Sequence, residues 1–319
     1  MPPTCMVTGS AGFIGSRLAS RLLADGWRVI GVDAFTDSYD PAEKRARATD
    51  LARHPGYRHL PHDLATLSLA GSLEGVSAVF HLAGRAGVRD SFSLTSAYLH
   101  DNVAATERLV RAAQRAPSVR RLVYASSSSV YGDAALPFRE DVEAAPISPY
   151  GQTKLEAEQC CLAASGDSLE TVALRYFTVY GPGQRPDMAL RRFAEAALAG
   201  GTLHLFGDGS QSRDFTFVDD IVEATRRALD APVAGLAVNV GGGSRVTLTE
   251  VVALLEEILG GPVAVRREPF AQGDVRHTVA DRTRASTLLG FQPEVAFRDG
   301  LAAEVEWLRN RNADVGRSA

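Results

Sequence analysis

The residues best suited to chemistry in this chain lie between Val123 and Lys154. An apolar run there ends in four consecutive hydroxyl side chains, Ser126 to Ser129, and Tyr150 stands four residues before Lys154. Residues i and i+4 share a face of an α-helix, so the Lys154 ammonium is expected beside the Tyr150 phenol. A nearby cation lowers a tyrosine pKa from its reference value of about 10. With a serine at the end of the preceding strand, the stretch predicts a proton-transfer site.

Tyrosine and lysine at this spacing are also common on exposed helix faces, so the rest of the chain must decide between the two interpretations. The predicted strand Thr4–Thr8 leads into Gly9, Gly12 and Gly15, spaced three residues apart. Such glycines permit a sharp turn, a close approach to a pyrophosphate and tight packing of the next helix. Asp33 ends the second predicted strand, where a carboxylate would accept from a ribose hydroxyl. No basic residue follows it immediately, which favours NAD over NADP; an ordinary tight turn is the alternative.

Three further features could serve the same dinucleotide. The insertion Ala34–His59 contains a basic helix with Lys44, which could lie over the adenosine or form a solvated helix face. Asp63 follows a short strand and could accept from the adenine amino group. After the predicted strand Ala78–Leu82, small residues let the backbone approach a ligand. The candidates from this last segment are Leu82, Ala83 and Gly84.

Composition excludes several classes of protein. The 319 residues carry 34 basic and 38 acidic side chains, a net charge of −4, so neither a nucleic-acid-binding stripe nor a charged disordered tail is indicated. Cys5, Cys160 and Cys161 have neither disulfide nor zinc-ligand spacing, and no metal site is predicted. No signal peptide and no apolar run of about 20 residues is visible. We expect a soluble, cytoplasmic protein without a membrane partner.

Strands and helices alternate along the first half of the chain, which predicts an α/β fold with a doubly wound parallel sheet of the Rossmann type. Residues 1–176 should form this NAD-binding domain, with 215–240 returning to it. Residues 177–214 and 241–319 should form a smaller mixed α/β carboxy-terminal substrate domain. One long helix is expected over Leu94–Arg115, and the stretch 207–220 is polar and rich in turn residues.

Arginines in separate loops are candidates for binding an anion. Arg185, Arg213 and Arg276 could clamp a diphosphate, because guanidinium groups bind phosphate oxygens bidentately. Arg89 is a further candidate anion contact. Surface ion pairing is the alternative for each of them.

Taken in order, the motifs TGSAGFIG, HLAG, SSSSVYG, SPYGQTK, LRYFTVYGP and NVGGGS resemble the extended short-chain dehydrogenase/reductase superfamily, in its nucleotide-sugar epimerase/dehydratase branch. The resemblance implies Ser127 as the catalytic hydroxyl, Tyr150 as acid/base, and Lys154 as the ligand of the nicotinamide ribose that also lowers the tyrosine pKa. It implies a homodimer through a four-helix bundle of Leu94–Arg115 and Tyr150–Ala164. Further cofactor contacts expected with it are Phe13, Ile14, Leu64, Asn102 and Tyr176.

Two sequence features indicate which subgroup of this branch the chain resembles. Sugar 4,6-dehydratases carry Asp-Glu after the catalytic hydroxyl, whereas this chain has Ser128 and Ser129, which disfavours elimination of water. The segments DAFTDSYDPAEKRAR, AGVRDSF and TVYGPGQRPDMA resemble the UDP-glucuronate 4-epimerases, although HLAGRAGVR replaces their more usual HLAAQAGVR at Gly84 and Arg85. Thr178 stands where galactose-type epimerases usually have Asn.

The resemblance therefore implies conversion of UDP-glucuronate to UDP-galacturonate through a 4-keto intermediate, with tightly bound NAD. Ser128, Ser129 and Thr178 are the expected neutral donors to the substrate carboxylate. Three alternatives remain open: a neutral UDP-hexose 4-epimerase, another nucleotide-sugar reductase or dehydratase, and a non-catalytic NAD-binding protein.

Overall fold

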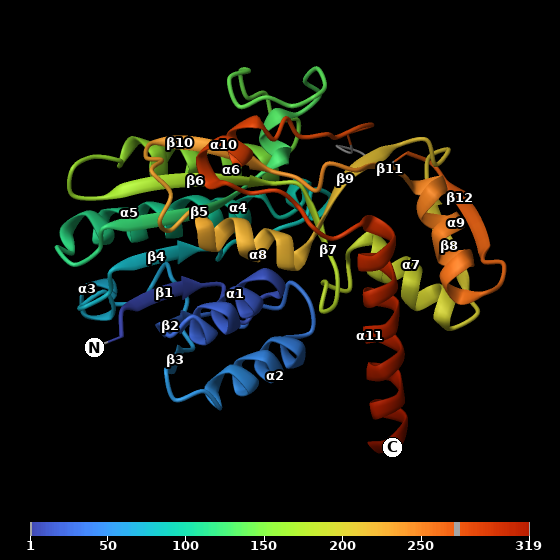
Figure 1. The fold of residues 1–319 in the computed structure, drawn as a ribbon, viewed down its shortest axis with the longest axis horizontal. Helices are drawn as coiled ribbons and strands as arrows, with labels where there is room; N and C mark the ends of the chain where they lie inside the picture. Colours follow the sequence, from blue (N-terminus) through green and yellow to red (C-terminus); the bar gives the residue numbers. More distant parts are fainter. Residues whose placement is uncertain (1, 271–274, 319) are drawn as a thin grey trace.

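The computed structural model of the chain describes residues 2–270 and 275–318. In these ranges, seven parallel strands form the central sheet in the order β3-β2-β1-β4-β5-β6-β10 (Figure 1). The strands are β1 (Thr4–Thr8), β2 (Arg28–Val32), β3 (Tyr57–Leu60), β4 (Ala78–His81), β5 (Arg121–Ser127), β6 (Glu170–Tyr176) and β10 (Leu236–Val240). The order reverses between β1 and β4, the switch point at which such sheets bind ligands. The predicted doubly wound parallel sheet is confirmed.

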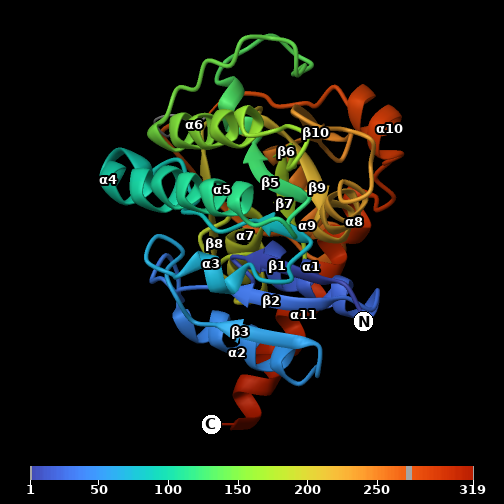
Figure 2. The same cartoon turned by 90° about the vertical axis from the view of Figure 1, so that its left-hand side faces the viewer.

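Helices cover both faces of this sheet because its strands are apolar on both sides. In β1, Cys5 and Val7 pack toward one face and Met6 toward the other, and all three are fully buried. The helices are α1 (Phe13–Ala24), α2 (Pro41–Ala52), α3 (Leu69–Ser72), α5 (Ala105–Arg115), α6 (Pro149–Ala163) and α8 (Val218–Arg227). Figure 2 shows α5 and α6 on one face and α1 and α8 on the other, and α2 packs against α1.

The helix predicted over Leu94–Arg115 is interrupted. It consists of α4 (Thr95–Tyr98), a π-helical segment η2 (Leu99–Ala104) and α5. Within η2, Asn102 accepts from the backbone N of Arg85 at 2.7 Å and donates to its carbonyl at 3.0 Å. These bonds hold the wide turn against the loop that follows β4. The interruption therefore results from a tertiary contact, which the helical periodicity of the sequence cannot predict.

The chain beyond β6 builds two smaller sheets, at the right of Figure 1. One contains β7 (Thr178–Tyr180), β9 (Ser212–Phe217) and β11 (Arg245–Thr247), and the other β8 (Thr202–Phe206) and β12 (Ala264–Glu268). The remaining helices are α7 (Ala189–Leu198), α9 (Leu248–Leu259), α10 (Thr283–Leu289) and α11 (Phe297–Ser318). No helix in the described ranges is both long and apolar enough to cross a membrane.

The stretch 207–220 was predicted as a turn-rich loop, and that prediction is wrong for its central part, which is strand β9. Asp214 in this strand is fully buried and accepts from the backbone N of Gly243 at 3.0 Å and of Ala280 at 2.9 Å. Satisfied in this way, a charged residue can occupy a buried strand. The domain boundary predicted between residues 214 and 215 falls inside β9.

Arg121, at the start of β5, ties the central sheet to the segment between α8 and β10. Its side chain is 5 % exposed, and its guanidinium donates to three backbone carbonyls. These belong to Ala228 (2.9 Å from Nε), Ala231 (3.0 Å from Nη2) and Val233 (2.7 Å from Nη1). A buried guanidinium is tolerated only when its donors are satisfied, so this part of the sheet depends on the segment 228–233.

Candidate active site

A long cleft runs along the carboxyl edge of the central sheet, and its other side is formed by the chain beyond β6. Its volume is about 880 Å³, near the upper end of the range for small-molecule sites. The predicted residues that line it are Gly9, Gly12, Phe13, Ile14, Gly15, Asp33, Lys44, Asp63, Leu64, Leu82, Ala83, Gly84, Arg89, Ser127, Ser128, Ser129, Tyr150, Lys154, Tyr176, Thr178, Arg185 and Arg213. The cofactor and substrate candidates therefore share one continuous cleft.

Two predicted site residues, Asn102 and Arg276, do not line the cleft as the described residues define it. The Asn102 amide is buried and bonded to the backbone of Arg85 and to the Thr153 hydroxyl at 3.0 Å. Asn102 therefore holds the loop after β4 in place from the side away from the cleft. Arg276 is exposed, and its guanidinium lies 5.7 Å from the centre of the Phe270 ring.

The turn between β1 and α1 forms the floor at one end of the cleft. Gly9 has a φ of +69°, and a Cβ on Gly15 would collide with the Gly9 carbonyl, so glycine is required for α1 to begin this close to the strand. Gly12 is the N-cap of α1 and offers no side chain to the first N–H groups. Those donors and the positive end of the helix dipole face the cleft and suit an anion. The Asp33 carboxylate, at the end of β2, accepts from Ala11 N at 3.1 Å and is thereby oriented over this turn.

Ser127 is the last residue of β5 and the N-cap of a 3₁₀ segment, η3 (Ser128–Tyr131). Its Oγ accepts from Ser129 N at 3.1 Å, which orients the side chain and leaves its own proton for a bond to the Tyr150 phenol or to a ligand. Gly151 lets α6 begin against this segment, because a Cβ there would lie 2.5 Å from the Ser129 carbonyl oxygen. The close packing places Ser127 and Tyr150 on the same part of the cleft wall.

The Tyr150 phenol is partly buried, and its environment acts on its acidity in two directions. Burial raises the pKa of Tyr150 above its ordinary value, whereas the Ser127 hydroxyl and the positive charge of Arg185 oppose this rise. The net pKa is raised. Tyr150 can accept a proton only as a phenolate, so its action as a base depends on groups that stabilise that form. Ser127 and Arg185 both do so.

Lys154 lies one turn along α6 from Tyr150. Its Nζ donates to the Ala125 carbonyl at 2.5 Å and lies 4.3 Å from the centre of the Tyr124 ring. Burial lowers the pKa of Lys154 to about 8. In this arrangement the side chains that oppose the rise in the Tyr150 pKa are Ser127 and Arg185, while the Lys154 ammonium binds the Ala125 carbonyl. The expected effect of Lys154 on the Tyr150 pKa stays a prediction.

A buried ion pair lies behind these residues. Glu158, one turn beyond Lys154 on α6, binds Arg175 of β6 with Nη2–Oε1 at 2.6 Å and Nε–Oε2 at 3.1 Å. Ser126 donates to the same carboxylate at 2.5 Å, and Arg175 Nη1 donates to the Tyr131 hydroxyl at 2.8 Å. The network joins α6 to the end of β5 and so fixes the distance between the helix and the serine run.

The three predicted arginines that line the cleft come from separate segments. Arg185 pairs bidentately with Asp187, at 3.1 and 2.7 Å. The Arg89 guanidinium lies 4.1 Å from the centre of the Phe206 ring at the end of β8. Arg213 donates to the Ser212 carbonyl at 2.9 Å. Their convergence on one cleft favours an anionic ligand over the surface ion pairing that each residue alone would equally suggest.

The lining also contains residues that were not predicted, among them Thr36 and Tyr39 beside the glycine turn, and Arg192 and Phe206 in the half formed beyond β6. Thr36 and Tyr39 lie in the loop just before the predicted basic helix. Their position next to that helix could have indicated that they also line the cleft. Phe206 is an aromatic residue at a strand end beside a glycine turn, which is also a recognisable pattern. Arg192 carries no distinguishing signal within its helix.

Comparison with known proteins identifies the family. The family model described as "NAD dependent epimerase/dehydratase family" matches residues 5–241, well over half of the chain. The chain belongs to the NAD dependent epimerase/dehydratase family. The resemblance to the nucleotide-sugar branch of the extended short-chain dehydrogenases/reductases is thereby confirmed.

This member of the NAD dependent epimerase/dehydratase family is similar to its relatives over nearly its whole length. It is 36% identical over 308 residues to the UDP-glucuronate 4-epimerase of Thermodesulfobacterium geofontis, covering 95% of each chain. The structure of the UDP-glucuronic acid 4-epimerase from Bacillus cereus in complex with UDP-glucuronic acid and NAD matches with a TM-score of 0.93 at 34% identity, covering 97% of this chain and 99% of that one. MoeE5 in complex with UDP-glucose and NAD matches with a TM-score of 0.88 at 41% identity, with the same coverage.

Proposed function

We propose that this protein epimerises C4 of a UDP-sugar with NAD as cofactor, and that it converts UDP-glucuronate to UDP-galacturonate. The observation that carries the proposal is that Ser127, Tyr150 and Lys154 lie in the same cleft as the glycine turn and Asp33. A site for binding alone does not require such a trio of hydroxyl, phenol and amine. The similarity to UDP-glucuronate 4-epimerases supports the choice of substrate.

The glycine-rich end of the cleft fits NAD. The uncapped amino terminus of α1 suits a pyrophosphate, and the Asp33 carboxylate suits the adenosine ribose hydroxyls. Lys154 is assigned to the ribose next to the nicotinamide, because its ammonium reaches the carboxyl end of β5. When bound, NAD supplies the acceptor and donor of the C4 hydride.

Tyr150 and Ser127 are assigned to the C4 oxygen of the sugar. The Tyr150 phenolate takes the C4 hydroxyl proton as C4 is oxidised, and returns it after the 4-keto sugar has turned about its diphosphate linkage. Ser127 hydrogen-bonds the C4 oxygen in both poses, so the proton acceptor stays aligned. Acid–base assistance of this kind is worth about 10²–10⁴ in rate.

Three neutral donors distinguish this cleft from one built to eliminate water. Ser128, Ser129 and Thr178 line the cleft beside Ser127, and no carboxylate replaces them at 128 or 129. A 4-keto glucuronate is a β-keto acid that readily loses CO₂. Neutral hydrogen bonds to its carboxylate hold the carboxylate plane unfavourably for that loss, so we assign these three residues to the C6 carboxylate.

The direct test is chromatographic analysis of products after incubation of the purified protein with UDP-glucuronate and with UDP-glucose. We expect UDP-galacturonate from the first. A UDP-pentose as the main product would contradict the carboxylate assignment. Turnover of UDP-glucose alone would instead establish a neutral UDP-hexose 4-epimerase, the second candidate, which the similarity to MoeE5 in complex with UDP-glucose favours.

Replacing Arg213 with Ala should weaken UDP binding by about 10- to 100-fold, because a hydrogen bond to a charged group contributes about 1.5–3 kcal/mol. Arg185, Arg213 and Arg276 are assigned to the diphosphate and uridine end of the substrate, although the Arg276 side chain reaches it only by moving from its exposed position. Calorimetric titration with UDP measures the effect. Arg298→Ala, which removes an exposed pair with Glu257, is the control. Unchanged UDP affinity in the Arg213 variant would remove this residue from the site.

We further infer a homodimer through α4, α5 and α6, which lie side by side on one face of the molecule (Figure 2). Leu94 and Leu99 at the start of this surface are 47% and 43% exposed, as expected for apolar side chains that a second copy covers. Within each copy, we assign residues 177–214 and 241–319 to nucleotide-sugar binding and the remainder to NAD. A monomer by light scattering would contradict the dimer.

A further inference from the structure

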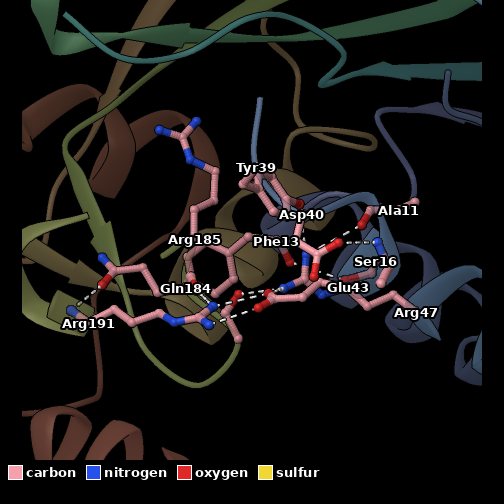
Figure 3. A network of polar contacts seen from close by, with 12 residues as sticks. Ala11, Phe13, Ser16, Tyr39, Asp40, Glu43, Arg47, Gln184, Arg185 and Arg191 are labelled. Atoms are coloured by element: carbon pink, nitrogen blue, oxygen red, sulfur yellow. Dashed lines mark hydrogen bonds and ion pairs between the residues drawn. The ribbon is translucent and has the colours of Figure 1, made fainter. Parts of the chain in front are cut away.

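A largely buried carboxylate, that of Glu43, joins the two sides of the cleft at a point where neither ligand is assigned. Glu43 of α2 binds Arg191 of α7 bidentately, with Nη1–Oε2 at 3.0 Å and Nη2–Oε1 at 2.8 Å (Figure 3). Arg311 of α11 adds a third contact, Nη2–Oε1 at 2.7 Å. The Arg191 side chain is 3% exposed and that of Glu43 12%. Helices 148 residues apart in sequence are thus held by one desolvated ion pair.

The same arginine holds the loop that carries Arg185. Arg191 Nη1 donates to the Gln184 carbonyl at 2.6 Å, and the Arg191 backbone N donates to the Gln184 side chain at 3.1 Å. One residue earlier, the Gly183 carbonyl accepts from Arg47 of α2 at 2.9 Å. Two guanidinium groups therefore fix successive carbonyls immediately before Arg185, and one of them comes from the opposite side of the cleft.

The cofactor side of this contact is equally ordered. Arg47 Nη1 donates to the Tyr39 hydroxyl at 2.9 Å, and Lys44 Nζ donates to the Thr36 carbonyl at 2.8 Å. Thr36, Tyr39 and Lys44 all line the glycine-rich end of the cleft. The two arginines and Glu43, by contrast, lie outside the lining that the described residues form. They connect the two ends of the cleft without occupying either.

We propose that Glu43, Arg47 and Arg191 are positioning residues that couple the two ligands: NAD, by ordering residues 36–44, also fixes the loop 181–185 and with it Arg185. This inference rests on the proposed function for the identity of the two ligands. Such coupling is reciprocal, so the UDP-sugar also strengthens retention of NAD. We therefore expect NAD to stay tightly bound during turnover.

Glu43 is the residue to change because its carboxylate forms ion pairs with Arg47, Arg191 and Arg311. Burial acts to raise its pKa, but the contacts with Arg191 and Arg311 outweigh burial and lower it, so the carboxylate is charged at neutral pH. Glu43→Gln keeps the shape of the side chain and removes that charge. Arg191 and Arg311 then lack their shared counterion, and the 181–185 loop keeps only the Arg47 contact as its attachment to α2.

The experiment measures the dissociation constant of NAD with and without saturating UDP, together with hydrogen exchange of the backbone amides in 179–188. In the native protein we expect UDP to tighten NAD binding about tenfold, within the usual 5- to 150-fold range of coupling factors. In Glu43→Gln the ratio should fall to about twofold or less, and exchange in the loop should accelerate about tenfold. Arg298→Met, which breaks an exposed ion pair between α11 and α9, should change neither quantity.

Each result decides one question. A native protein that binds NAD but not UDP contradicts the proposed function, and exchange in the 179–188 segment then still tests the connection to Glu43. A native ratio of one, or an unchanged ratio in Glu43→Gln, overturns the coupling. If Glu43→Gln does not fold, Arg311→Met removes only the 37% exposed third partner and should lower the ratio in the same direction by a smaller factor; no change there overturns the inference.

Discussion

Replacing Tyr150 with Phe should reduce epimerisation by about 10²–10⁴-fold, the usual worth of acid–base assistance, while NAD remains bound. The change removes one oxygen from a ring that α6 and the η3 segment hold in place, so the cleft keeps its shape. Tyr176, the sheet partner of Ser127, also lines the cleft, but its hydroxyl is bonded to the Thr225 hydroxyl at 2.7 Å. Product formation and the NAD retained after desalting, measured on the same preparation, separate loss of chemistry from loss of cofactor.

Tyr124→Phe is the matched control for this experiment. Tyr124 is also buried, its ring lies beneath the Lys154 ammonium, and its hydroxyl has no hydrogen-bond partner among the described residues. Removing that hydroxyl keeps the ring, so activity should stay within about twofold of native. Substantial epimerisation by a folded Tyr150→Phe protein would contradict the catalytic assignment.

Replacing Arg175 with Met should lower the free energy of unfolding by about 3–5 kcal/mol, because it leaves the carboxylate of Glu158 buried without its counterion. The pair is among the least exposed in the molecule, with 7% and 2% of the two side chains accessible. The loss should also reduce activity, since Glu158 follows Lys154 by one turn and holds Ser126 next to Ser127. Urea denaturation measures the stability.

Two comparisons sharpen this second prediction. Arg111→Met breaks an ion pair with Glu107 whose side chains are 66% and 43% exposed, and should cost no more than about 1 kcal/mol. The double replacement Arg175→Met with Glu158→Leu removes both charges and should recover part of the stability, because an apolar pair needs no counterion. An Arg175→Met protein as stable as Arg111→Met would show that the buried carboxylate finds another partner.

Local patterns were sufficient for the parts of the site that lie within one strand–turn–helix unit. The spacing of Gly9, Gly12 and Gly15 after an apolar run predicted the turn, and the strand order places that turn at the switch point. Ser127 and Tyr150 were predicted to converge, and they do so because β5 ends at the helix that carries Tyr150. In these segments, the turn residues and the helical period are enough to predict how the site residues are placed.

Contacts between distant segments could not be predicted in the same way. Strand β9 was missed because its polar residues are satisfied by partners such as Gly243 and Ala280, which no local pattern brings to Asp214. The direction of the Lys154 ammonium depends on the Ala125 carbonyl, and Asn102 turned away from the cleft because the Arg85 backbone binds it. The Glu43–Arg191 pair likewise becomes visible only once the fold brings α2 and α7 together.

The buried guanidinium of Arg121 has a consequence for how the protein is made. When a ribosome has delivered the chain through Tyr176, six neighbouring strands of the central sheet are available to pair, but the carbonyls of Ala228, Ala231 and Val233 have not yet been synthesised. At about 5–20 residues per second, they follow several seconds later. During that interval the nascent sheet keeps an open edge at β6, and the Arg121 guanidinium has Glu170 as a partner but lacks its three carbonyl acceptors. Amino-terminal fragments that stop before residue 233 should therefore be prone to aggregation and dependent on chaperones, and the cofactor-binding half is not separable from the rest of the chain by simple truncation.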